Sequence, residues 1–472
     1  MRLPSTPYYH LAQITIECQS PLSIKGDESD PTLDNTLIRD AADNPIIPAT
    51  SITGVLSHLY KETYGEKEQE KVFGFAKDKE SAISSLNINF GYVLNAKQQP
   101  QKGAIHSLSE NNDSLLDYLR QLTPVIRDQV KLNEYGTAED KAKFDRTAVP
   151  KGTRFQFEMG LAAQEPDNQT WQNLLGLLSH PKFRLGGLTH RGFGQIKVIE
   201  IKQTLLNFKD KNDLKKWQNF RQSQNWQDLQ PAPETNSKTP SAHKFHTLKL
   251  KAEDFWRVGA GSTPLGEYDK IPDALPYTED TINWEKSPTD PQRVVTIPAT
   301  GIKGALRHRT LFHLRRLEQD YDGTTIQEDN PCIIQIFGTA ADEQKNSQIE
   351  LPNDKQPGIG GLIINDLYLE QHSTPKMMMH NKIDRFTGGV INGALFSEEL
   401  LYEDTLNLEF YFDPNRLQGL DDKAQDAFIA ALEDLANGRL PLGAGSSKGH
   451  GYFQAEKAEL KTLIAQFQAA CQ

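Results

Sequence analysis

Apolar and polar residues alternate in two short stretches of the chain, as they do in strands with one buried face. The first is Ile14-Thr-Ile-Glu-Cys18 and the second is Leu248-Lys-Leu-Lys-Ala252. Each is followed by a segment rich in carboxylates, residues 27–44 and 261–294, which we expect to be a loop. One pattern in both halves of the chain predicts an internal duplication.

A longer repeat supports this duplication. Ile47-Pro-Ala-Thr-Ser-Ile-Thr-Gly-Val-Leu-Ser-His58 matches Ile297-Pro-Ala-Thr-Gly-Ile-Lys-Gly-Ala-Leu-Arg-His308, position by position. Each segment predicts a turn followed by an amphipathic helix, with Thr50 or Ser51 in the first copy and Thr300 in the second as the N-cap.

The start of the second of these helices has nearby cations. Helix N-termini bind anions, and Lys303 and Arg307 add positive charge, so we expect a phosphate to bind there. The first copy has Thr53 and Ser57 in those places, which predicts a weaker site near Ser51. A plain packing helix is an equally good interpretation of the first copy.

Further elements recur in the same order in both halves. The matched pairs are Phe-Gly turns at 73–74 and 337–338, strands at 88–93 and 361–369, polar glycine-bearing hairpins at 130–143 and 380–395, strands at 153–159 and 405–411, and helices at 168–179 and 423–437. A strand, a helix, two strands, a helix and a final strand, such as the run at 196–199, form a split βαβ order.

Each half then reaches a glycine-rich loop with one basic residue. The loops are Gly-Gly-Leu-Thr-His-Arg-Gly-Phe-Gly at 186–194 and Gly-Ala-Gly-Ser-Ser-Lys-Gly-His-Gly at 443–451. Closely spaced glycines leave N–H groups uncovered, and Arg191 or Lys448 adds charge, which is typical of phosphate binding. A single such loop is more often a simple connection. Neither loop has Walker A spacing or a convincing dinucleotide fingerprint, which argues against ATP and NAD.

The order of elements predicts an α+β protein of two tandem ferredoxin-like or RRM-like domains. The domains are expected at residues 1–229 and 244–472, with a linker at 230–243 that is rich in Pro, Ser and Thr. Residues 203–229 predict one or two exposed charged helices at the end of the first domain.

Composition narrows the class of protein. The chain has 472 residues, 37% hydrophobic and 24% charged, which is typical of a globular protein with more than one domain. It has no apolar run that could cross a membrane and no apolar start, so we expect a cytoplasmic protein that does not bind membranes.

The three cysteines of the chain are far apart in sequence, which argues against disulfides and a structural zinc site. The net charge of −11 is mild evidence against nucleic acid, although a local basic strip suffices for binding.

The acidic loop, the Ile-Pro-Ala-Thr helix, the Phe-Gly turn, the polar hairpin and the glycine-rich loop, in this order, resemble the RAMP superfamily. More specifically, they resemble backbone subunits of type III CRISPR effector complexes, and two copies look like the double-backbone fusion of type III-D-like systems. The resemblance implies RRM-like palms with inserted thumb hairpins near residues 130–150 and 380–396. It also implies a role in antiviral defence, with guide CRISPR RNA, complementary target RNA and other effector subunits as partners.

The resemblance assigns roles to individual residues. The residues expected to bind RNA are Ser51, Lys131, Asn133, Gly186, Gly187, Arg191, Gly192, Gly194, Lys303, Arg307, Asn381, Lys382, Arg385, Gly443, Gly445, Lys448 and Gly449.

In this family an aspartate of the acidic loop cuts target RNA with Mg²⁺ or Mn²⁺. It matches Asp34 here, as the catalytic residue and the metal ligand. The longer second loop leaves Asp269 and Asp273 as candidates, with Asp280 and Asp290 behind them, and its site could be absent or displaced. Without the resemblance, Asp34 would be interpreted as an ordinary loop carboxylate.

Two other functions stay open from the sequence. One is a purely structural RNA-binding subunit that does not cleave. The other is a metal-independent endoribonuclease that processes guide RNA by acid–base catalysis, for which His58 and His308 in the repeated helix are candidates.

Overall fold

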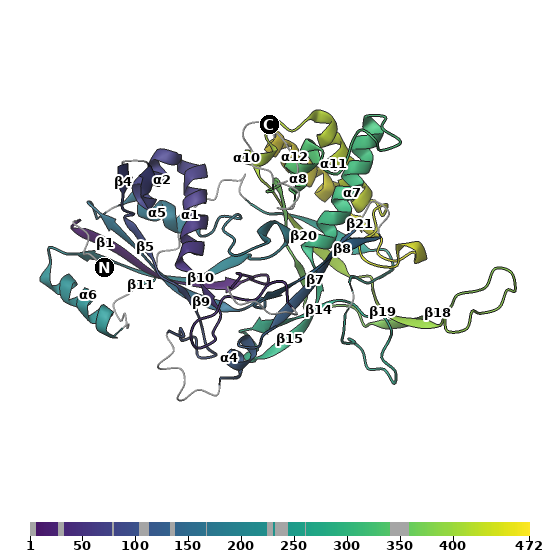
Figure 1. Cartoon of the computed structure of the whole chain (residues 1–472), viewed down its shortest axis with the longest axis horizontal. Coiled ribbons are helices and arrows are strands. Elements are labelled where there is room, and N and C mark those ends of the chain that lie inside the picture. The colour runs from purple at the N-terminus through teal and green to yellow at the C-terminus, as the bar shows by residue number, and fades with distance from the viewer. Residues whose placement is uncertain are drawn as a thin grey trace. The chain divides into compact units, whose positions relative to one another are not determined.

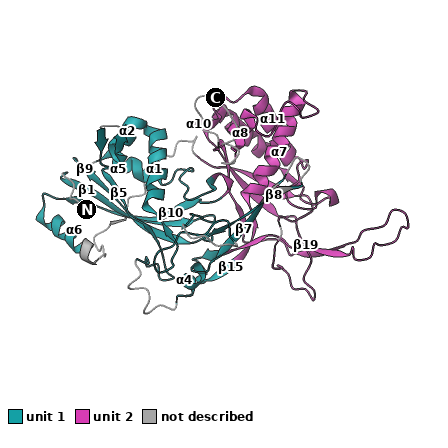
Figure 2. Ribbon diagram, viewed as in Figure 1, with its two compact units in different colours: residues 1–189, 193–240, 281–292 teal, residues 190–192, 241–280, 293–472 magenta. Residues whose placement is uncertain are grey.

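The computed structural model describes residues 6–26, 33–77, 80–102, 113–132, 137–166, 168–223, 230–231, 244–259, 261–339 and 358–472. The protein is a mixed α+β chain that divides into two compact units (Figure 2). Unit 1 comprises residues 1–189, 193–240 and 281–292, and unit 2 comprises residues 190–192, 241–280 and 293–472. The main change of unit lies between residues 240 and 241, and two short segments, 190–192 and 281–292, are each counted with the other unit.

Unit 1 is built on one antiparallel sheet, with the strand order β11-β10-β1-β9-β6-β2 and with β5 also paired to β9 (Figure 1). Its strands are β1 (Tyr8–Cys18), β2 (Ile46–Ile47), β5 (Leu86–Ile88), β6 (Gly91–Val93), β9 (Arg154–Ala163), β10 (Ile196–Asn207) and β11 (Gln230–Pro231). The alternation at the end of β1 places Ile14, Ile16 and Cys18 in the core, each fully buried.

Helices cover the core face of this sheet. They are α1 (Ala49–Tyr64), α2 (Glu66–Phe73), α4 (Ser114–Leu119) and α5 (Gln169–Leu177), and a short hairpin of β3 (Phe75–Lys77) and β4 (Glu80–Ala82) follows α2. The first part of β1 is also covered on its other face, where Tyr9 and Leu11 pack near Trp217 of α6 (Lys211–Ser223).

Unit 2 repeats this plan with the strand order β16-β20-β12-β21. The strands are β12 (His246–Ala252), β16 (Leu362–Ile364), β20 (Thr405–Phe412) and β21 (Phe453–Ala455). Its other strands are β13 (Phe255–Trp256) and β17 (Leu367–Leu369). Two further strands, β14 (Thr278–Asn283) and β15 (Ser287–Ile297), are divided between the units, because residues 281–292 are counted with unit 1. Its helices are α7 (Ala299–Leu317), α8 (Pro331–Phe337), α10 (Pro414–Leu417), α11 (Asp422–Ala436) and α12 (Lys457–Cys471).

The two units therefore share one connectivity. In unit 1 the order is β1, α1, β5, β9, α5, β10, and in unit 2 it is β12, α7, β16, β20, α11, β21. In both sheets the first strand lies between the third and the last, and the second strand lies beyond the third. This is the split βαβ order that the repeated sequence patterns predict.

A long two-stranded hairpin interrupts each plan between the second and third strands. In unit 1 it is formed by β7 (Val125–Leu132) and β8 (Ala138–Ala148), and in unit 2 by β18 (Lys376–His380) and β19 (Phe396–Tyr402). The β18–β19 hairpin and its loop project away from the rest of unit 2 (Figure 1).

Three local predictions were wrong. Residues 203–207 belong to strand β10, so the predicted charged helix begins only at Lys211. The second acidic segment is no simple loop, because it contains β14 and most of β15. The N-caps of α1 and α7 are Pro48 and Pro298, with extended backbone and no side-chain hydrogen bond.

Among the described residues, no helix combines the length and apolar character needed to cross a membrane.

Candidate nucleic-acid interface

The two glycine-rich loops have the same backbone hydrogen bonds. In unit 1, Gly187 N donates to Ser23 O (2.9 Å) and Leu185 N donates to Gly194 O (3.0 Å). In unit 2, Ala444 N donates to Arg257 O (2.8 Å) and Leu442 N donates to Gly451 O (2.8 Å). This agreement in bonding supports the duplication at the level of single atoms.

The same bonds change the expected role of the glycines. The amides of Gly187 and Gly194 donate to carbonyl oxygens of unit 1, and Lys448, Gly449 and Gly451 donate likewise in unit 2. These particular N–H groups therefore donate to the protein itself, while the predicted RNA contacts of the other loop glycines stay a prediction. The glycines are explained by backbone conformation: Gly186, Gly192, Gly194, Gly443, Gly445 and Gly449 all have positive φ.

Arginines surround the loop of unit 1. The guanidinium of Arg127, on β7, lies 4.7 Å from the ring centroid of the buried Phe193. Arg146, on β8, approaches Gly187 so closely that a Cβ there would lie 2.8 Å from its Nη1. Arg191 ends a short 3-10 turn, Thr189–Arg191, and is half-buried. Sequence reasoning missed Arg127 and Arg146 because they come from the distant hairpin.

The basic residue of the unit 2 loop is paired with a buried acid. Lys448 Nζ contacts the carboxylate of Glu398 on β19, which is 1% exposed, and Arg257 Nη2 lies 3.3 Å from that carboxylate. Burial raises the pKa of Glu398, but the hydrogen bond and charge of Lys448 and the charge of Arg257 outweigh burial and lower it. Lys448 therefore joins the loop to the hairpin, in addition to any contact with RNA.

At the start of α7, both cations of the predicted phosphate site donate hydrogen bonds to the protein itself. Lys303 is buried, and its ammonium donates to Leu362 O (2.8 Å) and His190 O (3.2 Å) within unit 2. Arg307 donates to Gly338 O (2.8 Å) and Glu328 O (2.9 Å). Asp366 Oδ1 accepts from Ala299 N (2.8 Å), so a carboxylate of the protein already lies at this helix N-terminus. Both cations thus bind carbonyl oxygens of the protein itself.

Ser51 lies in the first turn of α1 and is half-buried, with its amide donating to Pro48 O (3.0 Å). The described contacts of Ser51 thus leave the predicted phosphate binding at this helix start as a prediction.

Asp34 is exposed, and the hairpin holds it in place. Its N–H donates to Asp145 Oδ1 (3.1 Å), and Asp145 N–H donates back to Asp34 Oδ2 (3.0 Å). Asp145 lies on β8, the strand by which the hairpin returns to the sheet. The next residue of the acidic loop is also tied, because Thr147 Oγ donates to Asn35 O (2.7 Å). Asp34 Oδ1 takes part in neither of the two bonds between Asp34 and Asp145.

Asp273 has the same arrangement in unit 2. Its N–H donates to Ser397 Oγ (3.2 Å), and Ser397 N–H donates back to Asp273 Oδ2 (2.8 Å). Ser397 follows Phe396 on the returning strand β19 just as Asp145 follows Phe144 on β8. Hydrogen bonds from the backbone and hydroxyl of Ser397 lower the pKa of Asp273, so it is ionised at neutral pH.

These bonds distinguish Asp273 from Asp269, the two candidate cutting residues of the second acidic segment. Asp273 occupies the position equivalent to Asp34, whereas Asp269 is exposed and has no such pair of bonds to β19. The more distant Asp280 lies 2.9 Å from Arg293 Nε in an ion pair, and Asp290 is exposed on β15.

Both hairpins expose apolar side chains. The exposed apolar residues are Ile126, Val130 and Leu132 in unit 1 and Met377, Met379, Ile383, Phe386, Val390, Leu395 and Phe396 in unit 2. The predicted residues Asn381, Lys382 and Arg385 lie in the second loop and are exposed beside them. Lys131 belongs to β7, but its side chain is outside the described part of the chain, as is all of Asn133.

Phe386 is an exposed aromatic residue of this loop that the sequence analysis did not single out. It is 99% exposed and follows Asp384, whose Oδ1 accepts from Phe386 N and Thr387 N, both at 2.8 Å. These backbone bonds lower the pKa of Asp384 and fix the turn that presents the ring. An aromatic residue in a polar, glycine-rich segment was the available signal.

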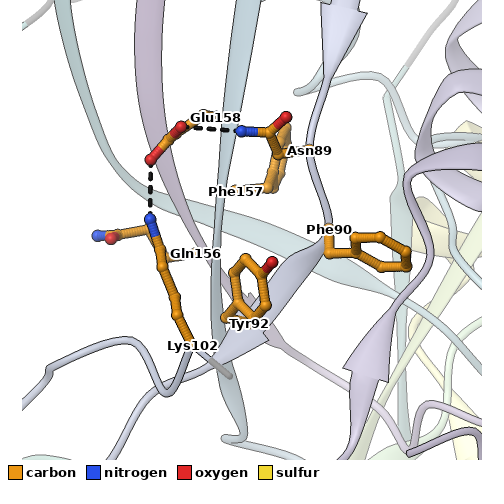
Figure 3. A pocket seen from close by; sticks show the side chains of 7 residues that line it. All are labelled: Asn89, Phe90, Tyr92, Lys102, Gln156, Phe157 and Glu158. Atoms are coloured by element: carbon orange, nitrogen blue, oxygen red, sulfur yellow. Dashed lines mark hydrogen bonds and ion pairs between the residues drawn. The ribbon is translucent and has the colours of Figure 1, made fainter. Parts of the chain in front are cut away.

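A shallow hollow of unit 1 lies where β6 meets β9 (Figure 3). Glu158 accepts from Lys102 Nζ and Asn89 Nδ2, each at 2.9 Å, beside the rings of Phe90 and Tyr92. Unit 2 has the same pair in Asn365 Nδ2 and Glu409 Oε2 (2.6 Å). Because the Asn–Glu pair recurs, it belongs to the fold of each unit.

The predicted metal has a modest set of donors here. Within the described residues no group of three or more His, Cys, Asp and Glu side chains is placed to hold an ion. Mg²⁺ commonly binds one or two carboxylates and completes its shell with water and substrate phosphates. Asp34, whose Oδ1 takes no part in the bonds to Asp145, fits that mode of binding when RNA supplies the remaining oxygens.

Comparison with known proteins gives three findings. The family model of the RAMP superfamily matches residues 15–197 and 249–454. Among solved structures, the chain is similar to a chain of the cryo-EM structure of the type III-B Cmr-beta complex bound to cognate target RNA, with 16% identity and a TM-score of 0.28. That match covers 41% of this chain and 60% of the other. No curated protein matches.

Proposed function

The chain belongs to the RAMP superfamily, and on this premise we propose that it is a guide-RNA-binding backbone subunit of a type III CRISPR complex that cuts complementary target RNA. We assign the cutting to Asp34 in unit 1 and to Asp273 in unit 2. The observation that carries the proposal is the equivalent pair of reciprocal hydrogen bonds that ties each aspartate to the returning strand of its hairpin.

In this proposal each unit is a ferredoxin-like palm with a thumb. The thumbs are the β7–β8 and β18–β19 hairpins, whose exposed apolar side chains suit a wedge between stacked bases. The exposed Lys382 and Arg385 would contact phosphates next to the wedge of unit 2. In unit 1, Arg127 and Arg146 supply positive charge near the glycine-rich loop 186–194, and Arg191 is part of that loop.

The chemistry that we propose is attack of a ribose 2′-hydroxyl on the adjacent phosphate. The new bond gives a 2′,3′-cyclic phosphate, the bond from phosphorus to the 5′-oxygen of the next nucleotide breaks, and that oxygen leaves as a 5′-hydroxyl while the attacking 2′-hydroxyl loses its proton to solvent. A thumb that splays one nucleotide out of the stack permits the in-line geometry that this attack needs. Asp34 and Asp273 would hold a divalent cation, Mg²⁺ or Mn²⁺, which supplies stabilisation of the charge that develops on the phosphate. The protein's own part is to fix the position of the carboxylate, and both aspartates are anchored through their backbone and one carboxylate oxygen.

The test is cleavage mapping in the reconstituted complex with labelled complementary RNA and Mg²⁺. Asp34→Ala and Asp273→Ala should each remove a different cut, slowing it by at least about 100-fold, as expected when charge stabilisation is lost. RNA binding should stay unchanged in both variants. Asp269→Ala is the matched control, because Asp269 lies in the same loop without the anchoring bonds.

Other outcomes assign the alternative functions. If Mg²⁺ and Mn²⁺ both give no fragments with the unmodified complex, the subunit binds RNA without cutting it. If cleavage continues in a chelator and falls within guide-repeat RNA, the protein is the metal-independent processing enzyme. If Asp269→Ala removes a cut and Asp273→Ala does not, the assignment within the second loop is wrong.

A further inference from the structure

The returning strand of each hairpin holds the acidic loop at more than one point. In unit 1, Asp145 is bonded to Asp34, and Thr147, two residues on, is bonded to Asn35 (2.7 Å). In unit 2, Ser397 is bonded to Asp273, and the fully buried Glu399, two residues on, accepts from Leu265 N and Gly266 N (3.0 and 2.8 Å). Equivalent positions thus bind the loop in both units.

The side chain at the first of these positions differs between the units. Asp145 Oδ1 and Ser397 Oγ accept the same hydrogen bond, from the amide of the proposed cutting aspartate (3.1 and 3.2 Å). The reverse bond comes from the main chain in both cases and survives any substitution except proline. In unit 1 one of the two anchoring bonds therefore depends on the side chain of Asp145 and can be removed selectively. In unit 2 the Ser397 hydroxyl also donates to Asp273 Oδ2 (3.1 Å), so Ser397→Ala removes two bonds and leaves the main-chain bond.

We infer that Asp145 and Ser397 are positioning residues that fix the cutting carboxylates relative to the thumb hairpins; this inference rests on the proposed function. A carboxylate on a surface loop samples many positions unless its backbone is held. Tying it to the strand that leaves the thumb keeps it at a constant place relative to the nucleotide that the thumb displaces. A small misplacement of a catalytic group is costly for reaction rate and has little effect on binding.

The inference gives different expectations for three substitutions at one position. Asp145→Ala removes the acceptor, so the cut made by unit 1 should slow by roughly three- to tenfold, the equivalent of one hydrogen bond. Asp145→Asn and Asp145→Ser keep an oxygen acceptor and should retain at least about half of the rate, as one expects if Ser397 performs this role in unit 2. Ser397→Ala should slow only the cut made by unit 2.

The experiment uses the full chain in the reconstituted complex, with each cut quantified separately at saturating target RNA. Hydrogen exchange measured by mass spectrometry gives a readout besides activity: Asp145→Ala should speed exchange of the Asp34 amide, whereas Asp145→Asn should not. Thr147→Val is the matched control, because it removes the bond to Asn35 without touching either bond of Asp34. It should leave the cut made by unit 1 within about twofold.

The outcomes separate this inference from the proposed function. If Asp34→Ala leaves every cut intact, the proposed function fails. If Asp34→Ala removes a cut but Asp145→Ala and Ser397→Ala leave both rates unchanged, the positioning role alone is overturned. It is also overturned if Thr147→Val slows the cut as much as Asp145→Ala, because the effect would then be general loosening of the loop.

Discussion

At the scale of single residues, Gly186 and Gly443 meet one backbone requirement in two places. Their φ angles are +81° and +88°, and a Cβ would lie 2.4 Å from Ser23 O and 2.3 Å from Arg257 O. Both the conformation and the space thus exclude a side chain. Gly187 differs, because its repeat partner is already Ala444 and a Cβ there would meet only the end of the Arg146 side chain.

We predict that Gly186→Ala and Gly443→Ala each destabilise the protein by at least about 2 kcal/mol, from left-handed backbone strain and the clash with a carbonyl oxygen. Gly187→Ala should cost clearly less. The midpoint of urea unfolding measures the effect. Equal losses for Gly186→Ala and Gly187→Ala would show that the strain argument is wrong.

Glu62 gives a prediction about pH. It lies 2.5 Å from Lys182 Nζ and 3.5 Å from His58 Nε2, with its carboxylate largely buried. Burial raises its pKa, but hydrogen bonds and charges of His58 and Lys182 outweigh burial and lower the pKa from 4.5 to about 2. Because the folded-state pKa lies below the unfolded value, the stabilisation is complete above about pH 4.5 and is lost as the pH falls towards 2.

Glu62→Gln should therefore lower stability at pH 7 by roughly 1–2 kcal/mol, allowing for solvent screening. The difference from the unmodified protein should shrink between pH 4.5 and pH 3. Thermal unfolding across this pH range tests it. A difference that stays constant with pH would mean that the ion pair contributes nothing and that only packing is lost.

At the scale of elements, the β18–β19 hairpin combines a turn fixed by hydrogen bonds with an almost fully exposed phenylalanine ring. Asp384 holds the turn through backbone N–H groups, and Phe386 stands almost fully exposed beside Lys382 and Arg385. A ring that contributes no packing to the fold can be removed without loss of stability. Any effect of its removal therefore reports on binding.

Phe386→Ala should leave the thermal unfolding temperature unchanged and weaken RNA binding by about 5- to 100-fold, if the ring stacks on one base. Ile83→Ala is the control, since Ile83 is 91% exposed but lies outside both hairpins. Fluorescence anisotropy with labelled guide RNA gives the affinities. An unchanged affinity for Phe386→Ala would exclude the ring from the interface.

At the scale of the whole molecule, a net charge of −11 is compatible with RNA binding because the cations are gathered locally. Arg127 and Arg146 lie around the unit 1 loop, and Lys382 and Arg385 lie in the unit 2 hairpin. Lys303 and Arg307, in contrast, hold the protein's own carbonyl groups, so a count of basic residues overstates the charge offered to RNA.

This distinction predicts the salt dependence of guide binding. Lys382→Ala and Arg385→Ala should each reduce the slope of log K against log salt concentration by roughly 0.7, the value for one phosphate contact on a single strand. Affinities at several salt concentrations give the slope. A slope that neither substitution changes would remove both residues from the phosphate contacts.

Local pattern was sufficient for much of the architecture. The duplication, the order of strands and helices, the Phe-Gly turns and the place of both glycine-rich loops are all written in residues that lie close together in the sequence. The β14–β15 hairpin was missed because its strands are largely polar. Residues 203–207, which are uncharged, were assigned to a helix together with the charged segment that follows them, so the end of β10 was missed.

The sequence by itself determined which segments form each unit and which loops carry the carboxylates, since strand and helix periodicity is a local property. Only the tertiary structure decided which side chains of these segments are anchored, paired or buried. The bonds that single out Asp34 and Asp273 join residues 111 and 124 positions apart, and they arise when a hairpin folds back against a loop. In the folded protein Lys303 is also buried, and Lys448 forms an ion pair with Glu398. Such choices depend on long-range packing and hydrogen bonding, which no repeat pattern encodes.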